Sequence, residues 1–262
     1  MKFLPQIGFL KSKLENKQNN FNALYENGKF KNRIDTPLRS ETFTHKDILN
    51  VLFRKEKGRM PQYDISLKLP EIEAFSIYDN CFMWLGHSSI FVRLNGSNFL
   101  VDPVFSGVAS PFTLIGPKEY KYSHTIIPQS LPEIDCIVVT HNHYDHLDYK
   151  TVLYYKDSVK LFIVPLGLSK ILKYWGVAEQ RIVELDYWQT TTFADVEITA
   201  TPARHYSQRA FFDKDKTLWM SFVMKTKSNT LFFSGDSGYD IHFKEIGNKF
   251  SQFDWAFLEC GQ

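Results

Sequence analysis

Residues 140–146 (THNHYDH) are the feature that most constrains the fold of this chain. They place three of its eight histidines and one aspartate within six consecutive positions, at His141, His143, Asp145 and His146. Neutral imidazole nitrogens and carboxylate oxygens are the ligands that borderline divalent ions such as zinc prefer. Crowded titratable side chains without such a partner cost solvation free energy. The cluster therefore predicts a metal site.

The segments on either side of the cluster predict a strand before it and a helix after it. Residues 134–139 form a short apolar, β-branched run that is typical of a buried strand. Between residues 146 and 155, apolar side chains recur at helical spacing, and Asp145 is an acidic residue suitably placed near the helix start. The ligands are therefore expected in a turn at the carboxyl end of a strand.

The length of 262 residues suits one large α/β domain with a large core. Residues 1–73 are expected to be an N-terminal extension that packs on the catalytic domain. Within it, residues 16–22 and 27–29 are predicted to be irregular and residues 44–54 helical. The catalytic domain is expected to span residues 74–262, with two similar layered halves.

Short apolar runs in the catalytic domain predict strands that alternate with helices. The first three strands, joined by turns at Gly86 and Asn95-Gly96, are expected to form an antiparallel meander. Residues 107–131 contain three prolines and are too long for an ordinary connection, which favours a functional loop at the substrate entrance. The predicted strands are residues 82–85, 89–94, 98–102, 160–164, 196–200, 218–225, 230–234 and 254–258, and the further helices are residues 166–175, closed by Gly176, and 240–250.

The composition argues against some partners and leaves others open. Charged residues make up 23% of the chain and the net charge is only +2, so no general electrostatic case exists for binding nucleic acid or an anionic membrane. The 23 Phe and 13 Tyr could form an aromatic core, or line an apolar groove for an acyl substrate. We expect a lipid or small-molecule substrate, and leave open peripheral membrane contact and a homo-oligomer.

The cysteines and the N-terminus favour a cytoplasmic location. Cys81, Cys136 and Cys260 are odd in number and widely spaced, which indicates a reducing compartment, and we predict that they are buried thiols. No apolar run approaches the ~20 residues of a spanning helix. The apolar start of the chain is broken by Pro5 and Gly8 and lacks the small-residue cleavage site of a secretory signal.

Two further ligand candidates follow predicted strands elsewhere in the chain. His205 comes shortly after residues 196–200, and Asp236 comes directly after residues 230–234. The neighbouring Gly235 and Gly238 would let the backbone turn tightly around the carboxylate. Taken alone, Asp236 would more often be a helix cap. Beside the histidine cluster, both residues are predicted metal ligands, because a metal site needs more than one segment.

With these residues in place, the chain resembles the metallo-β-lactamase superfamily, whose signature His-x-His-x-Asp-His stands at residues 141–146. More narrowly, it is similar to N-acylphosphatidylethanolamine-hydrolysing phospholipases D and their bacterial relatives, in motifs that follow in order from Trp84 to the end of the chain. These motifs are WLGHSS at 84–89, DPVF at 102–105, Ala109-Ser110-Pro111, GPK at 116–118, HNHYDHLDY at 141–149, VPLGL at 164–168, ELDYW at 184–188 and FFSGDSGY at 232–239.

The resemblance implies an αββα sandwich that holds two zinc ions at one edge. It assigns one zinc to three histidines, the second to Asp145 and a fourth histidine, and the bridge between them to Asp236. The three histidines of the first zinc would be His141, His143 and His205, and the fourth histidine His146. In relatives of this kind the chain continues beyond the strand at 254–258 and supplies a last metal-binding histidine. We therefore expect a truncated second half, with an open apolar edge that is prone to association.

The resemblance also assigns supporting residues. Asp102 would orient a ligand histidine through a hydrogen bond, and His87 would lie near the site without binding metal. The remaining histidines, His45, His124 and His242, match no ligand position and are expected on the surface or in packing.

The implied reaction is hydrolysis of a phosphodiester. Two zinc ions would lower the pKa of a bridging water toward ~7, so that hydroxide attacks phosphorus while Asp145 or Asp236 accepts a proton. The expected enzyme is a phosphodiesterase of phospholipase D type acting on N-acylphosphatidylethanolamine-like lipids. Two alternatives stay open: a lactonase or other ester hydrolase on the same metal core, and a truncated metal-binding protein without turnover.

Overall fold

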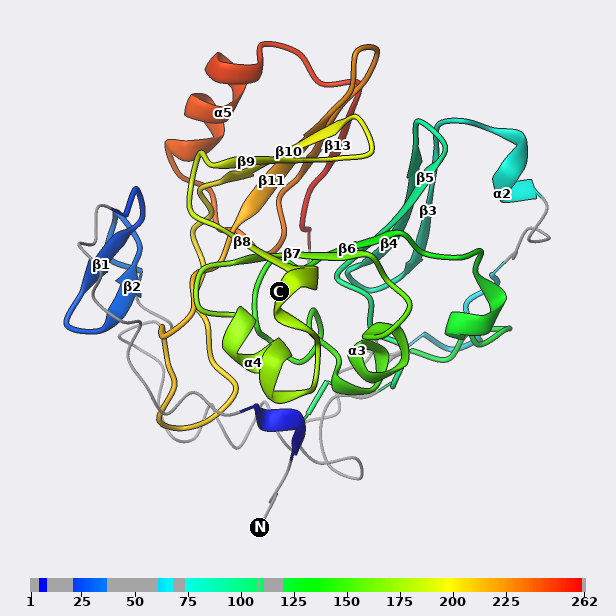
Figure 1. Cartoon of the computed structure of the whole chain (residues 1–262), viewed down its shortest axis with the longest axis horizontal. Helices are drawn as coiled ribbons and strands as arrows, with labels where there is room; N and C mark the ends of the chain where they lie inside the picture. The colour runs from blue at the N-terminus through cyan, green and yellow to red at the C-terminus, as the bar shows by residue number, and fades with distance from the viewer. Residues whose placement is uncertain are drawn as a thin grey trace.

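Two β-sheets packed face to face form the centre of the molecule, and helices cover their outer faces (Figure 1). This computed structural model describes residues 5–8, 21–36, 61–67, 74–107, 109–110 and 120–260. The six-stranded sheet has the order β3-β4-β5-β6-β7-β8 and the five-stranded sheet the order β13-β12-β11-β10-β9. The predicted α/β class and αββα sandwich are confirmed.

The six-stranded sheet is antiparallel at one side and parallel at the other. The first three strands form the predicted meander, and β5 to β8 are parallel, with helices between them. The strands are β3 (Cys81–Gly86), β4 (Ser89–Leu94), β5 (Ser97–Val101), β6 (Cys136–Val138), β7 (Leu161–Pro165) and β8 (Ile182–Leu185), and the helices α2 (Ala74–Ile77), α3 (Tyr149–Tyr155) and α4 (Ser169–Tyr174).

The five-stranded sheet is antiparallel from β9 to β12 and ends in β13, which runs parallel to β12. Its elements are β9 (Thr190–Phe193), β10 (Val196–Thr201), β11 (Ser221–Lys225), β12 (Thr230–Phe233), β13 (Trp255–Phe257) and the covering helix α5 (His242–Phe250). A separate hairpin of β1 (Leu24–Glu26) and β2 (Lys29–Lys31) lies beside the sandwich, and short 3-10 turns are η1 (Pro5–Ile7), η2 (Pro128–Ser130) and η3 (Glu179–Arg181).

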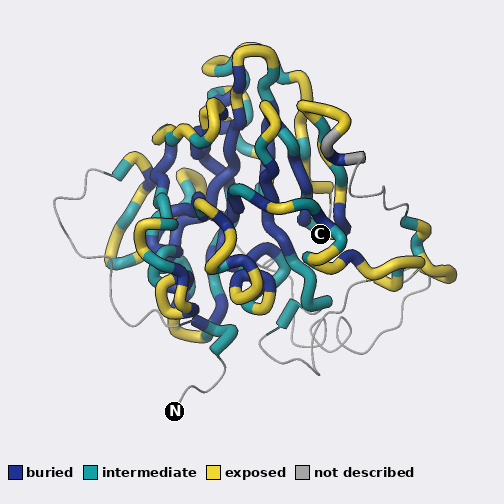
Figure 2. Tube along the Cα trace, turned by 45° about the vertical axis from the view of Figure 1, so that its right-hand side comes forward, coloured by how far each residue is buried: buried dark blue, intermediate teal, exposed yellow. Residues whose placement is uncertain are grey.

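The core is divided by the six-stranded sheet, because successive strand residues point to opposite faces. Phe99 and Val101 of β5 pack toward the five-stranded sheet, whereas Leu100 between them packs toward the helices. The outer cluster includes Val152 of α3 and Ile171 of α4. Figure 2 shows the buried strands running through the centre of the molecule. The fold therefore depends on strands that are apolar on both faces, as the β-branched runs of the sequence predicted.

Helix α3 starts later than the sequence predicted. It begins at Tyr149, and its N-cap is Asp148, whose side chain accepts a hydrogen bond from the Lys150 backbone N–H. The prediction of a helix from residue 146, with Asp145 at its start, is therefore wrong by one turn. Asp145 instead lies in the preceding turn, where its side chain is available to the site. Gly176 follows α4 with a φ of +94°, as the predicted helix end requires.

The prediction of irregular structure at residues 27–29 is confirmed for Asn27 and Gly28 but wrong for Lys29, which begins β2. Asn27 and Gly28, with φ of +53° and +81°, form the two-residue turn between β1 and β2, in which Tyr25 pairs with Phe30. Positive φ at both turn positions matches the right-handed twist of a hairpin, and Asn-Gly is the sequence that adopts it most readily. Phe30 is 1% exposed and belongs to the core between the sheets.

The hairpin therefore contributes to the stability of the whole molecule, which a substitution can test. Phe30→Ala is expected to lower the free energy of unfolding by about 3 kcal/mol, because it leaves a cavity in the core. Leu24→Ala in the same hairpin removes a side chain that is 46% exposed and should cost less than about 1 kcal/mol. Denaturant titration of both variants measures the difference. Equal losses would show that the hairpin does not pack as described.

Further sequence predictions need correction, and one concerns residues that the structure does not describe. Strands β8 and β9 were not predicted, because few of their residues are buried. Cys136 is buried as predicted, but Cys81 is half-buried and Cys260 is exposed, so the prediction of three buried thiols is wrong. The predicted helix at residues 44–54 lies outside the described residues. Within the described part of the chain, no helix is both long enough and apolar enough to cross a bilayer.

Candidate metal centre

The predicted site residues meet at one edge of the sandwich. β5 and β6 are parallel, and β10 and β12 are both antiparallel to β11, so the loops after each pair leave the same edge of their sheet. The residues are Asp102 after β5, His141, His143, Asp145 and His146 after β6, His205 after β10, Asp236 after β12, and His87 in the turn between β3 and β4.

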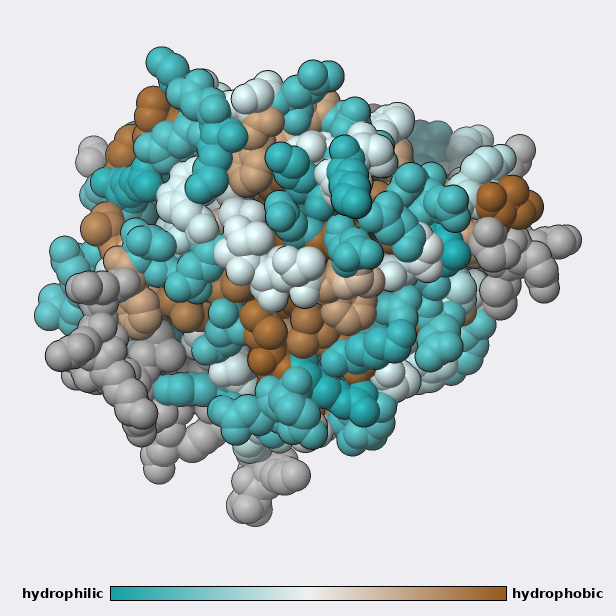
Figure 3. Space-filling view, turned by 45° about the horizontal axis from the view of Figure 1, so that its top comes forward, coloured by the Kyte–Doolittle hydropathy of each residue, from teal (hydrophilic) through white to brown (hydrophobic). Residues whose placement is uncertain are grey.

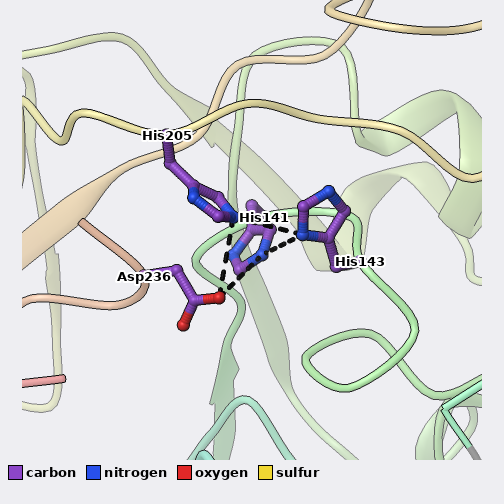
Figure 4. Close-up of side chains that lie close together, drawn as sticks. All are labelled: His141, His143, His205 and Asp236. Atoms are coloured by element: carbon purple, nitrogen blue, oxygen red, sulfur yellow. Dashed lines mark hydrogen bonds and ion pairs between the residues drawn. The ribbon is translucent and has the colours of Figure 1, made fainter. Parts of the chain in front are cut away.

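One group of four side chains converges as a metal site requires (Figure 4). His143 Nδ1 lies 2.9 Å from His141 Nε2 and 3.1 Å from His205 Nε2. Asp236 Oδ2 lies 3.9 Å from His141 Nε2 and 3.6 Å from His205 Nε2. All four ligand atoms lie within 4.8 Å of one another. The structure thus brings together the residues that the resemblance assigned to the first zinc.

A second group lies directly beside the first. His87, Asp145 and His146 each offer one ligand atom, again within 4.8 Å of one another. His146 Nε2 is 3.0 Å from Asp236 Oδ1. The two oxygens of Asp236 therefore face different groups, which is the arrangement expected of a bridging carboxylate.

His87 lies closer to the ligand atoms than its predicted supporting position implied. Its Nε2 is 3.1 Å from Asp145 Oδ2, and its backbone φ of +43° is unusual for a residue with a side chain. Trp84 Nε1 donates to the His87 carbonyl at 2.7 Å, and the Ser88 hydroxyl donates to the Asp145 carbonyl. Such strained backbone is retained where the surroundings enforce it, often at functional sites. In the sequence, the motif at residues 84–89 was the signal that could have indicated this position of His87.

Asp102 sets the orientation of two histidines. Its carboxylate is 2% exposed and accepts hydrogen bonds from the Thr140 backbone N–H at 2.7 Å, the Thr140 hydroxyl at 2.6 Å and His146 Nδ1 at 2.8 Å. Because the Thr140 proton is directed at Asp102, the hydroxyl oxygen accepts from His141 Nδ1, 3.0 Å away. In both His141 and His146, Nδ1 therefore serves as a donor and Nε2 is turned toward the site.

Removing this orientation should weaken metal binding. Asp102→Asn is expected to lower zinc affinity by about 10-fold to 100-fold, because an amide cannot accept from all three donors. Competition with a chromophoric chelator measures the affinity. Asp135→Asn is the matched control, since that carboxylate also accepts a backbone N–H, from Asn98 at 2.9 Å, but lies before β6 rather than after it. An unchanged affinity in Asp102→Asn would contradict the assigned role.

The electrostatics of the site favour neutral histidines and ionised aspartates. Burial, with the neighbouring imidazoles, holds the pKa of His141 well below its ordinary value and lowers the pKa of His143 to about 3 and of His205 to about 4. Burial alone would raise the pKa values of Asp145 and Asp236. Hydrogen bonds from His87 and His146 outweigh burial, and both pKa values lie below the usual range.

His146 behaves differently from the other histidines. Burial lowers its pKa, but the carboxylates of Asp102 and Asp236 on either side outweigh burial and raise it. Three neutral imidazoles and several carboxylate oxygens thus face one another at short range, and a bound cation would stabilise this arrangement. The donor set of imidazole nitrogen and carboxylate oxygen fits a divalent metal.

The tight turn before Asp236 depends on one glycine rather than two. Gly235 has a φ of +53°, and a Cβ there would lie 2.9 Å from Thr140 Cβ, so a side chain would not fit. Gly238 has no positive φ and has room for a Cβ, so its predicted role is wrong. No helix begins at Asp236, which excludes the alternative of a helix cap.

The remaining histidines lie apart from both groups. His242 is 3% exposed, with its Nε2 3.0 Å from the Ser237 hydroxyl, and His124 is exposed. These positions agree with the predicted packing and surface roles, whereas His45 lies outside the described residues. The sequence analysis missed two buried residues that hold the site, Thr140 and Arg209. Thr140 directly precedes the histidine cluster, but a threonine is not a metal ligand, and the roles of both residues arise from contacts across the fold.

The sandwich topology and the histidine and aspartate cluster at its edge place this chain among metal-binding α/β sandwich proteins. The model of the beta-lactamase superfamily domain matches residues 97–262, more than half of the chain. The chain belongs to the metallo-β-lactamase superfamily, and its cluster is a divalent-metal site.

Relatives include proteins with and without a described activity. The chain is 34% identical over 211 residues to the uncharacterized protein Rv0906 of Mycobacterium tuberculosis, covering 80% of this chain and 56% of the relative. It is 35% identical over 189 residues to N-acyl-phosphatidylethanolamine-hydrolyzing phospholipase D 1 of Caenorhabditis elegans, covering 68% of this chain and 52% of that protein. The chain therefore spans about half the length of these relatives.

Among solved structures, the fold is similar to that of CmlA, a diiron beta-hydroxylase from Streptomyces venezuelae. The TM-score is 0.52 and the identity 23%, with 69% of this chain and 34% of that chain covered. At this identity the likeness concerns the fold alone.

Proposed function

We propose that this chain carries the metal centre of a phosphodiesterase of phospholipase D type, acting on N-acylphosphatidylethanolamine-like lipids. The observation that carries the proposal is the pair of donor groups joined by Asp236, whose two oxygens face different groups. The substrate class is supported by the Caenorhabditis elegans relative and by a second phospholipase D of this name from Saccharomyces cerevisiae, 38% identical over 68% of this chain and 39% of that protein.

Bound divalent ions, of which we propose two zinc ions, would polarise the scissile phosphodiester and make water more acidic. The residues of the chain supply the rest. His141, His143 and His205 stay neutral at pH 7, since burial lowers their pKa values, and so keep their lone pairs free for a cation. Asp145 and Asp236 stay ionised, with pKa values below the usual range, and are the proposed proton acceptors during hydrolysis.

A cavity of about 460 Å³ beside His205 offers room for part of the substrate. Ile34 and Tyr206 give it apolar surface, and the Tyr206 ring lies 4.5 Å from the ring of His143. Charges of both signs line it as well, from Lys31, Lys214, Asp35 and Asp215. This volume lies in the range of small-molecule sites, which is about 300–1,000 Å³. Apolar surface beside charges of both signs suits a substrate that has both an acyl chain and a polar head group.

Contact with a lipid surface is part of the proposal. Phe211 and Phe212, in the loop after His205, are 103% and 61% exposed. Exposed Phe side chains can insert at the boundary between lipid head groups and acyl chains. On the face drawn in Figure 3, polar side chains predominate and apolar ones gather in a patch near the centre. A cytoplasmic location, the absence of nucleic acid binding and a homo-oligomer stay predictions from the sequence.

A second candidate is oxidation chemistry on iron. The 4-amino-L-phenylalanyl-(CmlP-peptidyl-carrier-protein) 3-hydroxylase of Streptomyces venezuelae is 29% identical over 63% of this chain and 30% of that protein. Imidazole and carboxylate ligands suit iron as well as zinc. The reaction observed, hydrolysis or hydroxylation, therefore separates the two candidates.

Metal reconstitution tests the function. Protein stripped with a chelator is reloaded with zinc, manganese or ferrous iron and given vesicles containing N-acylphosphatidylethanolamine, and release of N-acylethanolamine is measured by mass spectrometry. A sugar lactone is the parallel substrate. We expect lipid hydrolysis that returns with zinc. Lactone opening without lipid hydrolysis would replace the proposal by the lactonase alternative, and metal binding without turnover of either substrate would favour the non-catalytic one.

A further inference from the structure

Arg209 is a buried cation in the loop that carries His205. It is 5% exposed, and the side-chain hydrogen bonds seen for it in the described part of the chain all end on main-chain oxygens. Burying a charge is costly unless hydrogen bonds satisfy it. The cost indicates that the position of this guanidinium matters to the fold around it.

The guanidinium holds the loop of the metal ligands. Its Nη1 donates to the carbonyls of Asn142 and Leu147, each at 2.8 Å, and more weakly to that of His143 at 3.4 Å. These carbonyls bracket the backbone that carries three of the candidate ligands. The guanidinium carbon also lies 4.0 Å from the centre of the Tyr144 ring.

The loop of the histidine cluster also donates a hydrogen bond to the loop that carries His205. The Tyr144 hydroxyl donates to the Arg209 carbonyl at 2.9 Å. Asp213 Oδ1 accepts from the backbone N–H of Arg209 at 3.0 Å and of Ala210 at 2.8 Å, which closes the loop after His205. The loop of His205 and the loop of the histidine cluster are therefore fixed to each other through one arginine.

The remaining donors of Arg209 bind the N-terminal turn η1, about two hundred positions away in the chain. The carbonyl of Gln6 accepts from Nη2 at 2.6 Å and from Nε at 3.1 Å. Trp175 Nε1 donates to the Pro5 carbonyl at 2.7 Å. Gly8 ends the turn with a φ of +70°, and a Cβ there would lie 2.8 Å from Ile171 Cγ2. The turn thus docks where only glycine fits.

We propose that Arg209 is a positioning residue of the metal centre, and that the N-terminal turn Pro5–Ile7 locks it in place and so tunes metal affinity from a distance. The planar fork of the guanidinium serves four carbonyls at once, which a lysine cannot do. Displacing the turn would leave two buried donors unpaired and free the guanidinium to move. The inference rests on the proposed metal centre but not on the substrate.

Arg209→Lys in the full chain is the first test. We expect zinc affinity to fall by about 10-fold to 100-fold, the usual effect of losing a group that orients metal ligands, and the visible absorption of the cobalt-loaded protein to change. Arg181→Lys is the matched control, because Arg181 also donates to two carbonyls, those of Asp157 and Val159, outside the site. It should keep the affinity and the cobalt spectrum of the unaltered chain.

Gly8→Val tests the N-terminal turn without touching the site. It should also lower zinc affinity, and the double variant should lose little more than Arg209→Lys alone, since both changes disrupt one contact. Should Arg209→Lys fail to fold, two other variants carry the test. They are Gly8→Val and Tyr144→Phe, which removes the hydroxyl that donates to the Arg209 carbonyl. Folded variants with unchanged affinity and spectrum would overturn the inference. Zinc binding without lipid hydrolysis in the unaltered chain would remove the proposed function only.

Discussion

Replacing His143 with alanine is expected to lower the metal content of the chain and to reduce the proposed phosphodiesterase activity by about 1,000-fold or more. His143 Nδ1 is the atom on which the first group converges, within 3.1 Å of both His141 Nε2 and His205 Nε2. A bound metal contributes several kcal/mol of charge stabilisation in hydrolysis, and each ~1.4 kcal/mol is tenfold in rate.

Metal content per chain, measured by elemental analysis beside the rate of lipid hydrolysis, checks this result. His124→Ala is the matched control, because it removes an exposed histidine that belongs to neither group. It should bind as much metal as the unaltered chain. If His143→Ala retained both metal and activity, the assignment of the site would be refuted.

Asp236→Asn is expected to affect both donor groups at once. The carboxylate oxygens lie 3.0 Å from His146 Nε2 and 3.6 Å from His205 Nε2. Asparagine is neutral and has one oxygen, so it cannot face both groups with an acceptor. We predict that the number of metal ions per chain falls from the proposed two to one or fewer, and that the proposed activity falls by about 1,000-fold.

A calorimetric titration with zinc counts the ions bound and measures their affinities. Glu197→Gln makes the same chemical change at an exposed carboxylate of β10 and should bind as the unaltered chain does. Two full-affinity ions in Asp236→Asn would show that this residue does not bridge the groups.

The secondary structure was predictable where local sequence and burial agree. The strands of the meander and the buried β6 were found because apolar, β-branched runs have few alternatives. The start of α3 was missed because Asp145 and Asp148 are both acceptable helix caps by sequence. The fold decides between them: Asp148 also accepts from the Ser106 backbone N–H at 3.0 Å, a contact that no local pattern contains.

The hairpin at the N-terminus shows a different kind of error. Its turn carried a recognisable Asn27-Gly28 signal, but the flanking strands are short and mostly exposed, so the polar composition favoured an irregular segment. Pairing with Tyr25 and burial of Phe30 against the sandwich stabilise the hairpin. A two-stranded hairpin gains its stability from such packing rather than from its own sequence.

The sequence by itself determined the metal chemistry, because His141, His143, Asp145 and His146 stand together in six positions and imidazole with carboxylate is a ligand set for divalent ions. With the motifs of the superfamily it also indicated His205, Asp236 and Asp102. These residues follow strands whose carboxyl ends share an edge, so their meeting is a consequence of the topology.

Only the tertiary structure decided how the donors are held. It placed His87 beside Asp145, set the lone pairs of His141 through Asp102 and Thr140, and joined two ligand loops and a distant N-terminal turn through Arg209. These roles depend on distances between atoms that are far apart in the chain. A buried hydrogen-bond donor must find its acceptors wherever the fold supplies them, and no spacing along the sequence encodes that position.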